Sequence, residues 1–299
     1  MAAKSAMPQP EDTDYSDIAL ICGYGSLPLE IARGAVEAGR KPFLVGIKGE
    51  ASNEIAAYPS EFLAWGQLGR LFKILKQRRI GEVVFAGGIH KRPELFELKL
   101  DLVAILTLPQ VLLFMLGGDN TVLSGLIKMF EKRGIKVSGA HEIAPKLLAA
   151  DGRIAGPRPG AKDLANIKLA FAACKALGRF DIGQAAVAEA LRVVAVEAVE
   201  GTDALLARIA AMREIGRMPA KGKNGVLVKT MKPGQDMRAD LPAIGPKTVD
   251  GVVRAGLCGI ALEAGHAIIL EREVTLAKAN AAGIYIYGIA AGIGGSDHG

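Results

Sequence analysis

Short apolar runs alternate with segments of helical periodicity through the first half of the chain. The runs are apolar on both faces, which is typical of strands buried in a parallel sheet. Predicted strands cover residues 18–22, 42–47, 82–86 and 136–139. Predicted helices cover residues 27–39, 68–79 and 121–133. This alternation predicts a Rossmann-like α/β domain at 17–148, with helices on both faces of a parallel sheet.

The composition changes after this first domain. Between residues 149 and 160, three glycines and two prolines stand among polar and small residues, which predicts an interdomain linker at 149–162. Strands and helices then alternate again. Predicted strands cover residues 192–198, 226–230, 259–262, 267–270 and 284–287, and predicted helices cover 163–177, 202–212, 246–255 and 273–281. The second half is therefore predicted to be another α/β domain, at 163–291.

The two ends of the chain and its longest apolar stretch indicate whether the protein is exported or spans a membrane. The start of the chain is acidic and has no apolar core of the kind found in signal peptides, so we expect a disordered tail at 1–16. A loose tail is expected at 292–299. The apolar stretch at 102–116 is broken by Pro109 and is too short to span a bilayer. These features predict a soluble protein that can still rest on a membrane.

Charge and composition narrow the class of ligand. The formal net charge is +6, which favours anionic ligands or an anionic membrane surface. Aromatic residues make up only 5% of the chain, which argues against a nucleic-acid surface built on stacked rings, so no nucleic-acid partner is expected. The three cysteines, Cys22, Cys174 and Cys258, form neither a disulfide framework nor a zinc spacing, which fits a reducing cytoplasm.

Two glycine turns follow predicted strands of the first domain. Gly23 and Gly25 stand between a strand and a helix, where free N–H groups can meet an anion. Pro28 takes the place of the third glycine of a dinucleotide fingerprint, which argues against NAD. Gly87 and Gly88 are followed by basic side chains that could hold phosphates. The alternatives are a tight turn without a ligand and a solvated turn.

Other candidate side chains of the first domain have simpler interpretations. Asp119 or Asn120 precedes a helix and is accounted for as an N-cap. His141 stands beside Glu142, but the histidines have no metal spacing, so a structural histidine is the favoured interpretation. The sequence shows neither a Cys–His pair nor a serine nucleophile elbow.

The densest polar region lies in the second domain. Glu197 interrupts an apolar strand, and Thr202 and Asp203 open the next helix, where either could be a cap. Between residues 221 and 247, six lysines and arginines accompany only two acids, Asp236 and Asp240. Such a loop fits phosphoryl chemistry, in which cations neutralise the phosphate and a carboxylate holds a metal or orients water. The alternative is a solvated loop with surface ion pairs.

Several short motifs, in one order from residue 18 to 287, resemble a known family. They include Gly23-x-Gly25-x-Leu27-Pro28, Phe85-Ala-Gly87, Gly118-Asp119, Gly139-Ala-His141-Glu142, Asp181-Ile-Gly-Gln184, Glu197-Ala-x-Glu200-Gly-Thr-Asp203, Lys232-Pro-x-Gln235-x-x-Arg238-x-Asp240-Leu-Pro242, Arg254-Ala-Gly-Leu-x-Gly259-Ile and Glu263-Ala-Gly265. The chain resembles the UDP-2,3-diacylglucosamine pyrophosphatases of lipid A biosynthesis, of the type unrelated to the calcineurin-like phosphoesterases.

The resemblance implies a magnesium-dependent hydrolase, with manganese as a substitute ion. Water would attack the α-phosphorus of the UDP-sugar and give UMP and 2,3-diacylglucosamine 1-phosphate. The family's key aspartate falls on Asp240, in the catalytic second domain, and Asp240, Glu197 and Asp203 are the candidate metal ligands. Other motif residues are carried over as walls of a substrate site: Gly23, Gly25, Leu27, Gly87, Gly88, Asp119, Gln184, Thr202, Asp203, Lys232, Gln235, Arg238 and Pro242.

The implied partner is a lipid-linked UDP-sugar. A cytoplasmic enzyme would meet that lipid by transient contact with the anionic surface of the inner membrane, and a homodimer is also expected. Two other functions stay open on the residues alone. One is a non-catalytic nucleotide or lipid binder, in which Asp240 only organises a loop. The other is a nucleotide-sugar oxidoreductase or transferase that uses the first domain.

Overall fold

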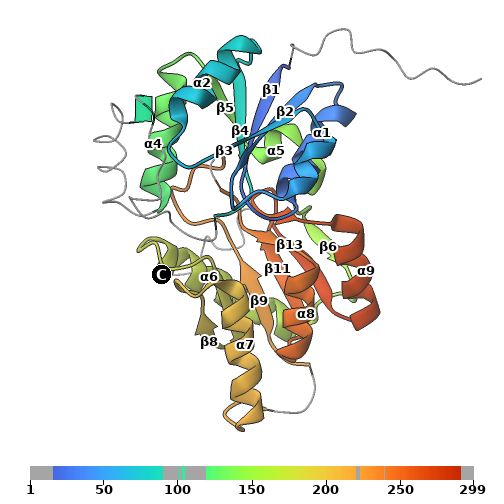
Figure 1. Ribbon diagram of the computed structural model, residues 1–299. Helices are drawn as coiled ribbons and strands as arrows, with labels where there is room; N and C mark the ends of the chain where they lie inside the picture. The colour runs from blue at the N-terminus through green and yellow to red at the C-terminus, as the bar shows by residue number, and fades with distance from the viewer. Residues whose placement is uncertain are drawn as a thin grey trace, which may run out of the picture. The chain divides into compact units, whose positions relative to one another are not determined.

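The computed structural model describes residues 16–89, 101, 103–104, 119–219, 223–238 and 240–290, and only the backbone of residues 119–122. The tails expected at 1–16 and 292–299 lie almost entirely outside these ranges. Contacts divide the chain into two compact units, shown in Figure 1. The first unit comprises Met1–Leu116 and Gly125–Ser138, and the second comprises Gly117–Ser124 and Gly139–Gly299.

The first unit is built on a five-stranded, wholly parallel sheet of order β3-β2-β1-β4-β5 (Figure 1). Its strands are β1 (Ile18–Cys22), β2 (Pro42–Ile47), β3 (Ser60–Leu63), β4 (Glu82–Ala86) and β5 (Lys136–Ser138). Its helices are α1 (Leu27–Glu37), the 3-10 helix η1 (Asn53–Ala57), α2 (Leu68–Gln77) and the part of α4 (Asp119–Glu131) that follows Ser124. The strand order reverses between β1 and β4, which is the switch point of a doubly wound sheet.

Buried apolar side chains hold these helices to the first sheet. Ile31, Ala32 and Ala35 of α1 are fully buried. On α4, Phe130 lies edge-on to Phe85 of β4, with ring centroids 5.6 Å apart. The predicted Rossmann-like architecture of the first domain is therefore confirmed.

The second unit is built on a six-stranded mixed sheet of order β6-β13-β11-β9-β7-β8. Its strands are β6 (Gly152–Ala155), β7 (Ala185–Glu189), β8 (Arg192–Val196), β9 (Val226–Lys229), β11 (Gly259–Glu263) and β13 (Tyr285–Ile289). The three central strands, β9, β11 and β13, are parallel, whereas β6, β7 and the hairpin partner β8 pair antiparallel. A small sheet of β10 (Ala243–Ile244) and β12 (Ile268–Ile269) lies apart from it.

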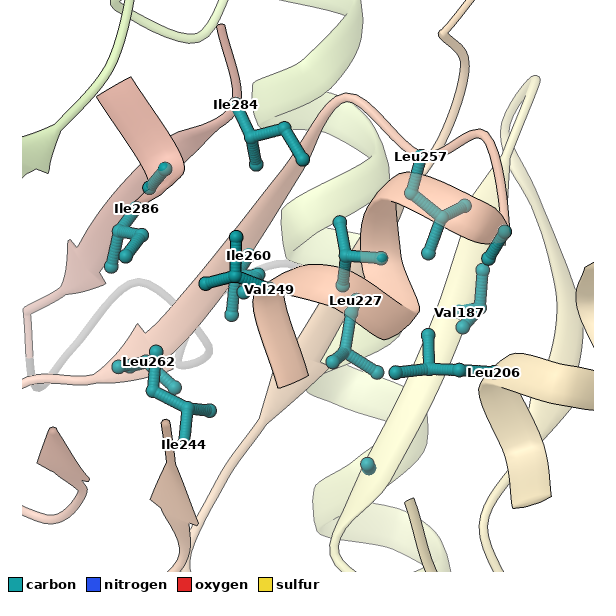
Figure 2. Close-up of a cluster of buried hydrophobic side chains, with 14 of the residues drawn as sticks. Val187, Leu206, Leu227, Ile244, Val249, Leu257, Ile260, Leu262, Ile284 and Ile286 are labelled. Carbon is teal, nitrogen blue, oxygen red and sulfur yellow. The ribbon is translucent and has the colours of Figure 1, made fainter. Parts of the chain in front are cut away.

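The two faces of the second sheet are covered by α6 (Ala161–Gly178), α7 (Gly201–Glu214), α8 (Pro246–Arg254) and α9 (Arg272–Ala282). The second unit also contains α5 (Ala140–Ile143) and the 3-10 helix η3 (Pro145–Leu147). Leu227, Ile260 and Ile286 are in register on one face, where they meet Leu206 of α7 and Val249 of α8 (Figure 2). The alternate positions of the same strands face α6, as strand alternation requires.

The interval between the predicted domains contains regular structure. Residues 149–162 were expected to form a linker from their glycines and prolines, but Gly152–Ala155 form β6, an edge strand paired with β13. Glycine-rich segments suit a sheet edge where another backbone approaches closely. Within the described ranges, none of the helices has the length and apolar character that crossing a membrane requires.

Candidate functional site

Predicted site residues of the second unit meet at one edge of its sheet. The parallel strands β9 and β11 end there at Lys229 and Glu263. Because β7 runs antiparallel to β9, its start is at the same edge, and Gln184 precedes it. The end of β8 returns to this edge, so that Glu197 N donates to Ala185 O at 2.8 Å. Ligands of α/β sheets gather at such carboxyl ends.

The loop at 230–242, which joins β9 to β10, carries Asp240 along this edge. Leu241 and Pro242, directly after Asp240, are buried. The carbonyl of Pro242 accepts a 2.8 Å hydrogen bond from the N–H of Ile268, and β10 then pairs with β12. Proline also restricts Leu241 before it to extended conformations. The backbone beside Asp240 is therefore fixed although the loop is irregular.

Gln235 links the two parts of this loop. Its amide Oε1 accepts a hydrogen bond from the N–H of Lys232 at 3.1 Å, and its Nε2 donates to Oδ2 of Asp240 at 3.2 Å. Gln235 is only 6% exposed, so neither bond competes freely with water. The predicted site residue Gln235 is thus a direct neighbour of the predicted catalytic residue.

The Asp240 carboxyl group has a raised pKa and is exposed to solvent. Desolvation raises the pKa of its carboxyl group above the ordinary 3.8, while the charges of Lys229 and Lys232 and the Gln235 hydrogen bond oppose that rise. The residue is nevertheless exposed to solvent. Protein surrounds the carboxyl group on most sides and leaves one side open, through which water can reach the carboxylate.

Lys229 at the end of β9 and Lys232 and Arg238 of the loop are each held by an oxygen. Nζ of Lys229, a buried residue, donates to Ala243 O at 3.0 Å. Nζ of Lys232 pairs with Asp181 at 2.5 Å. Arg238 pairs with Asp236, Nη2 to Oδ2, at 2.7 Å, and this hydrogen-bonded arginine lowers the pKa of Asp236 against the effect of burial.

Lys232 and Arg238 were both predicted to bind substrate. Lys232 is paired with Asp181 and Arg238 with Asp236. Either cation can bind a phosphate oxygen only if it leaves its carboxylate or binds both at once.

Glu197 is engaged by two donors. Its Oε1 accepts from the Thr202 hydroxyl at 2.7 Å, and its Oε2 accepts from the Gln184 N–H at 3.0 Å. The residue is 6% exposed. Thr202 therefore joins the start of α7 to the end of β8, while Asp203, in the same helical turn, is exposed. Glu197, Thr202 and Gln184 come together as the motifs suggested, whereas the structure records no interaction between Asp203 and this group.

Two buried polar atoms at this edge have no partner among the described residues: Oε1 of Gln184 and Nδ1 of His141. Buried polar atoms are nearly always hydrogen-bonded, so each calls for a water or a ligand. His141 lies close enough to Asp236 for its charge to lower the pKa of that carboxyl group. The structural role predicted for His141 therefore does not account for its Nδ1.

The glycine turns of the first unit close on each other at the switch point. Tyr24 N donates to Gly88 O at 2.8 Å, Gly88 N donates back to Tyr24 O at 3.0 Å, and Gly23 N donates to Ala86 O at 2.8 Å. A Cβ on Gly23 would lie 2.1 Å from Gly88 O. Close backbone approach accounts for Gly23 and for Gly87, whose added Cβ would lie 2.5 Å from Tyr24 O, whereas a Cβ on Gly88 would meet the Tyr24 ring. The N–H groups of Gly23 and Gly88 are not free for a phosphate.

The remaining predicted residues of the first half are placed as follows. Gly25 has a φ of +98°, with open space where a Cβ would stand, so its turn requires glycine for conformation alone. Leu27 begins α1, whose first turn carries Glu30, an acid that disfavours an anion there. Gly87 is exposed. Asp119 begins α4, but its side chain lies outside the described residues.

The histidine, cysteine and acidic side chains bear on metal binding and on thiol catalysis. Across the part of the chain that the structure describes, no group of three or more His, Cys, Asp or Glu residues could hold a metal ion. Burial raises the pKa of Cys22, Cys174 and Cys258 to about 12, and all three are free thiols. Thiolate catalysis is therefore disfavoured at neutral pH.

Three charged residues at this edge, Lys175, Lys229 and Glu263, were not among the predicted site residues, although Lys229 was counted in the basic loop and Glu263 belongs to a motif. Lys229 ends an otherwise apolar strand, and a lysine in that position is a signal that could have singled it out. Lys175 and Glu263 form an ion pair of 2.7 Å, although 88 residues separate them. No local pattern predicts such a pair.

Comparison with known proteins shows related sequences over both units. The family model for the LpxI N-terminal domain matches residues 17–147, and that for the LpxI C-terminal domain matches residues 150–287. The UDP-2,3-diacylglucosamine pyrophosphatase LpxI of Caulobacter vibrioides is 36% identical over 272 residues, which cover 91% of this chain and 97% of that protein.

Proposed function

The chain belongs to the LpxI family, and on that premise we propose that it hydrolyses the pyrophosphate bond of UDP-2,3-diacylglucosamine. The products are UMP and 2,3-diacylglucosamine 1-phosphate. The observation that carries the proposal is Asp240: a solvent-accessible carboxylate, hydrogen-bonded by Gln235 and flanked by two lysines, at the carboxyl edge of a mixed α/β sheet.

In the proposed reaction a water molecule attacks the α-phosphorus. Asp240 orients this water and accepts its proton, the new P–O bond forms on the uridylyl group, and the bond from the α-phosphorus to the bridging oxygen breaks. The leaving sugar phosphate takes the electron pair. The raised pKa of Asp240 makes its carboxylate a better base than an ordinary aspartate. Lys229 and Lys232 supply positive charge on the same side, which stabilises the charge that develops on the phosphate oxygens.

Magnesium is part of the proposal, with manganese as a substitute. Mg²⁺ commonly takes only one or two carboxylates and fills its other positions with waters and substrate phosphates. Asp240 is the candidate for such a site because it is exposed to solvent, although its carboxyl group accepts hydrogen bonds from Gln235 and from the Leu241 backbone. Both oxygens of Glu197 already have donors, and among the described residues no interaction joins Asp203 to this group, so Asp240 is the remaining candidate ligand. A carboxylate that held the ion would orient the attacking water without taking its proton. When bound, the ion supplies charge that polarises the phosphate.

The proposed reaction can be tested by incubating purified protein with UDP-2,3-diacylglucosamine, with magnesium or with EDTA, and measuring UMP by chromatography. Asp240→Ala is expected to lower kcat by about 100- to 10,000-fold, the usual effect of removing a general base. Asp250→Ala is the matched control, since Asp250 lies on α8 and pairs with Lys278. UMP formation that is equal in wild type and Asp240→Ala overturns the role of Asp240. Tight binding without cleavage supports a non-catalytic binder instead.

Contact with an anionic membrane surface is a further part of the proposal. The substrate carries two acyl chains, and the protein has a net charge of +6. Two large apolar residues near the Asp240 edge are strongly exposed: Phe180 at 76% and Val199 completely. Their turns are neighbours, because a Cβ on Gly183 would lie 2.1 Å from Glu197 O. Such side chains can enter a membrane interface.

The cytoplasmic location and the homodimer expected from the sequence remain predictions. Three free cysteines accord with a reducing compartment. The oligomeric state can be measured by light scattering on the purified protein.

A further inference from the structure

An ion pair is built into the root of the loop that carries Asp240. Nζ of Lys175, on α6, lies 2.8 and 2.7 Å from the two carboxylate oxygens of Glu263, the last residue of β11. The Glu263 side chain is 10% exposed and that of Lys175 is 29% exposed. Both side chains are thus largely withdrawn from water.

The pair holds the main chain at Met231. The Met231 N–H donates to Oε2 of Glu263 at 2.9 Å, and its carbonyl accepts from Nζ of Lys175 at 2.8 Å. Met231 follows Thr230, whose N–H bonds to Gln184 O at the end of the β9–β7 ladder. Lys175 and Glu263 therefore fix both polar groups of a residue that lies beyond the sheet.

A short series of hydrogen bonds joins this point to the carboxylate. The residue after Met231 is Lys232, whose N–H donates to Oε1 of Gln235, and Nε2 of the same amide donates to Oδ2 of Asp240. A displacement of Met231 moves Lys232 N and with it the amide that holds Asp240. Errors of about 1 Å at a reacting group can reduce a rate by about 100-fold.

We infer that Glu263, held by Lys175, is a positioning residue that sets the loop and thereby the carboxylate of Asp240 for hydrolysis. This inference rests on the proposed function. A contribution to stability alone accounts poorly for the pair, because removing two charges from water is costly and apolar side chains often fill such a place equally well. The pair instead bonds to both main-chain polar groups of Met231 and so fixes the position of that residue.

A second buried ion pair provides the matched control. Arg213 of α7 and Glu189 of β7 lie 2.7 Å apart, with side chains 8% and 7% exposed. Arg213 also donates to Ala255 O and Asn224 O. This pair lies at the end of β7 remote from Gln184, and therefore at the sheet edge opposite to Asp240. Glu189→Gln and Glu263→Gln remove the same charge from glutamates of similar burial.

The experiment compares steady-state UMP release by wild type, Glu263→Gln, Lys175→Met, the double variant and Glu189→Gln, with hydrogen exchange of the loop amides in each. Glu263→Gln is expected to lower kcat about 10- to 100-fold with KM changed less than about threefold, because Glu263 does not touch substrate. Exchange of the Met231 and Lys232 amides should accelerate. Lys175→Met should act likewise, and the double variant should be no worse than the more severe single one. Glu189→Gln should lose stability but keep the kcat of folded enzyme.

Wild-type kcat and unchanged loop exchange in folded Glu263→Gln overturn the inference, as does an equal loss of kcat in Glu189→Gln. Absence of UMP from wild type would instead overturn the proposed function. In that case, loop exchange in Glu263→Gln still decides whether the pair positions the loop.

Discussion

The side-chain amide of Gln235 donates a 3.2 Å hydrogen bond to Oδ2 of Asp240. An amide in this place can accept from the Lys232 N–H and donate to a carboxylate at the same time, which a glutamate cannot do while ionised. The bond holds the carboxylate in place and also opposes the rise in its pKa caused by desolvation. Position and basicity of Asp240 are therefore coupled through one side chain.

Gln235→Glu should shift the pH dependence of hydrolysis. Asp240 must be ionised to act as a base, so activity rises as the pH passes its pKa, which lies above 3.8. The new carboxylate repels the Asp240 charge and removes a donor, and both effects raise that pKa further. The acidic limb of the kcat profile should therefore move to higher pH. Gln235→Ala should move it in the same direction by less, and an unmoved limb in both variants contradicts the coupling.

The stability of the first unit should fall in acid because of Glu82. Burial acts to raise the pKa of this carboxyl group, but hydrogen bonds from Ser138, Lys136 and Arg40 outweigh it and lower the pKa from 4.5 to about 2. The ionised form is thus favoured in the folded state. Its contribution is complete above the unfolded value and is lost as the pH falls from 4.5 toward 2.

Urea unfolding followed by fluorescence of the single tryptophan, Trp65 in the first unit, measures this effect. The wild-type midpoint should drop between pH 5 and pH 3 more steeply than that of Glu82→Gln. This range lies where the carboxyl group is protonated in the unfolded chain and still ionised in the folded one. Parallel pH dependences in the two proteins would rule out this role of Glu82.

Gly23→Ala should destabilise the first unit. The added Cβ would lie 2.1 Å from the Gly88 carbonyl, a backbone atom that cannot rotate away, so the two turns must separate. Overpacking of this kind costs about 1–3 kcal/mol. Gly81→Ala is the control, because nothing lies within 4 Å of its added Cβ. The difference should be visible in the urea midpoint of Trp65 fluorescence, and equal midpoints for the two variants refute the close approach of the turns.

Phe180→Ser combined with Val199→Ser should weaken binding to anionic vesicles. Both side chains are strongly exposed, so their replacement should leave the urea midpoint of the second unit nearly unchanged. Co-sedimentation with vesicles of phosphatidylglycerol and of phosphatidylcholine separates apolar insertion from charge attraction. We expect wild type to favour the anionic vesicles and the double variant to bind both less. Equal binding by the two proteins excludes these residues as the contact.

The fold was largely predictable because most strands are apolar runs and most helices are amphipathic. The elements that were missed have physical reasons. β7 has the sequence Ala-Ala-Val-Ala-Glu, which lacks the large β-branched residues that predict a strand. β3 is four residues long and half-buried, and β6 lies among glycines and prolines. In each case the neighbouring strand, not the local sequence, determines the conformation.

The site was predictable only in part. Asp240 and Gln235 were identified through motifs, and the sheet brings Gln184, Glu197 and Thr202 to the same edge. The pair of Lys175 and Glu263 depends on two elements remote in sequence. Conversely, the glycines at 23 and 88 resemble a phosphate cradle in sequence, but their N–H groups bond to backbone carbonyls. The spacing of glycines alone does not show whether a ligand or the backbone of another turn lies against them.

The most direct test of the central claim is hydrolysis of UDP-2,3-diacylglucosamine in ¹⁸O-labelled water, with mass spectrometry of both products from wild type and Asp240→Ala. We expect one ¹⁸O atom in UMP, none in the sugar phosphate, and label incorporation at least about 100-fold slower in Asp240→Ala. Label in the sugar phosphate would contradict attack at the α-phosphorus. Label in UMP at the wild-type rate from Asp240→Ala would contradict the role of Asp240.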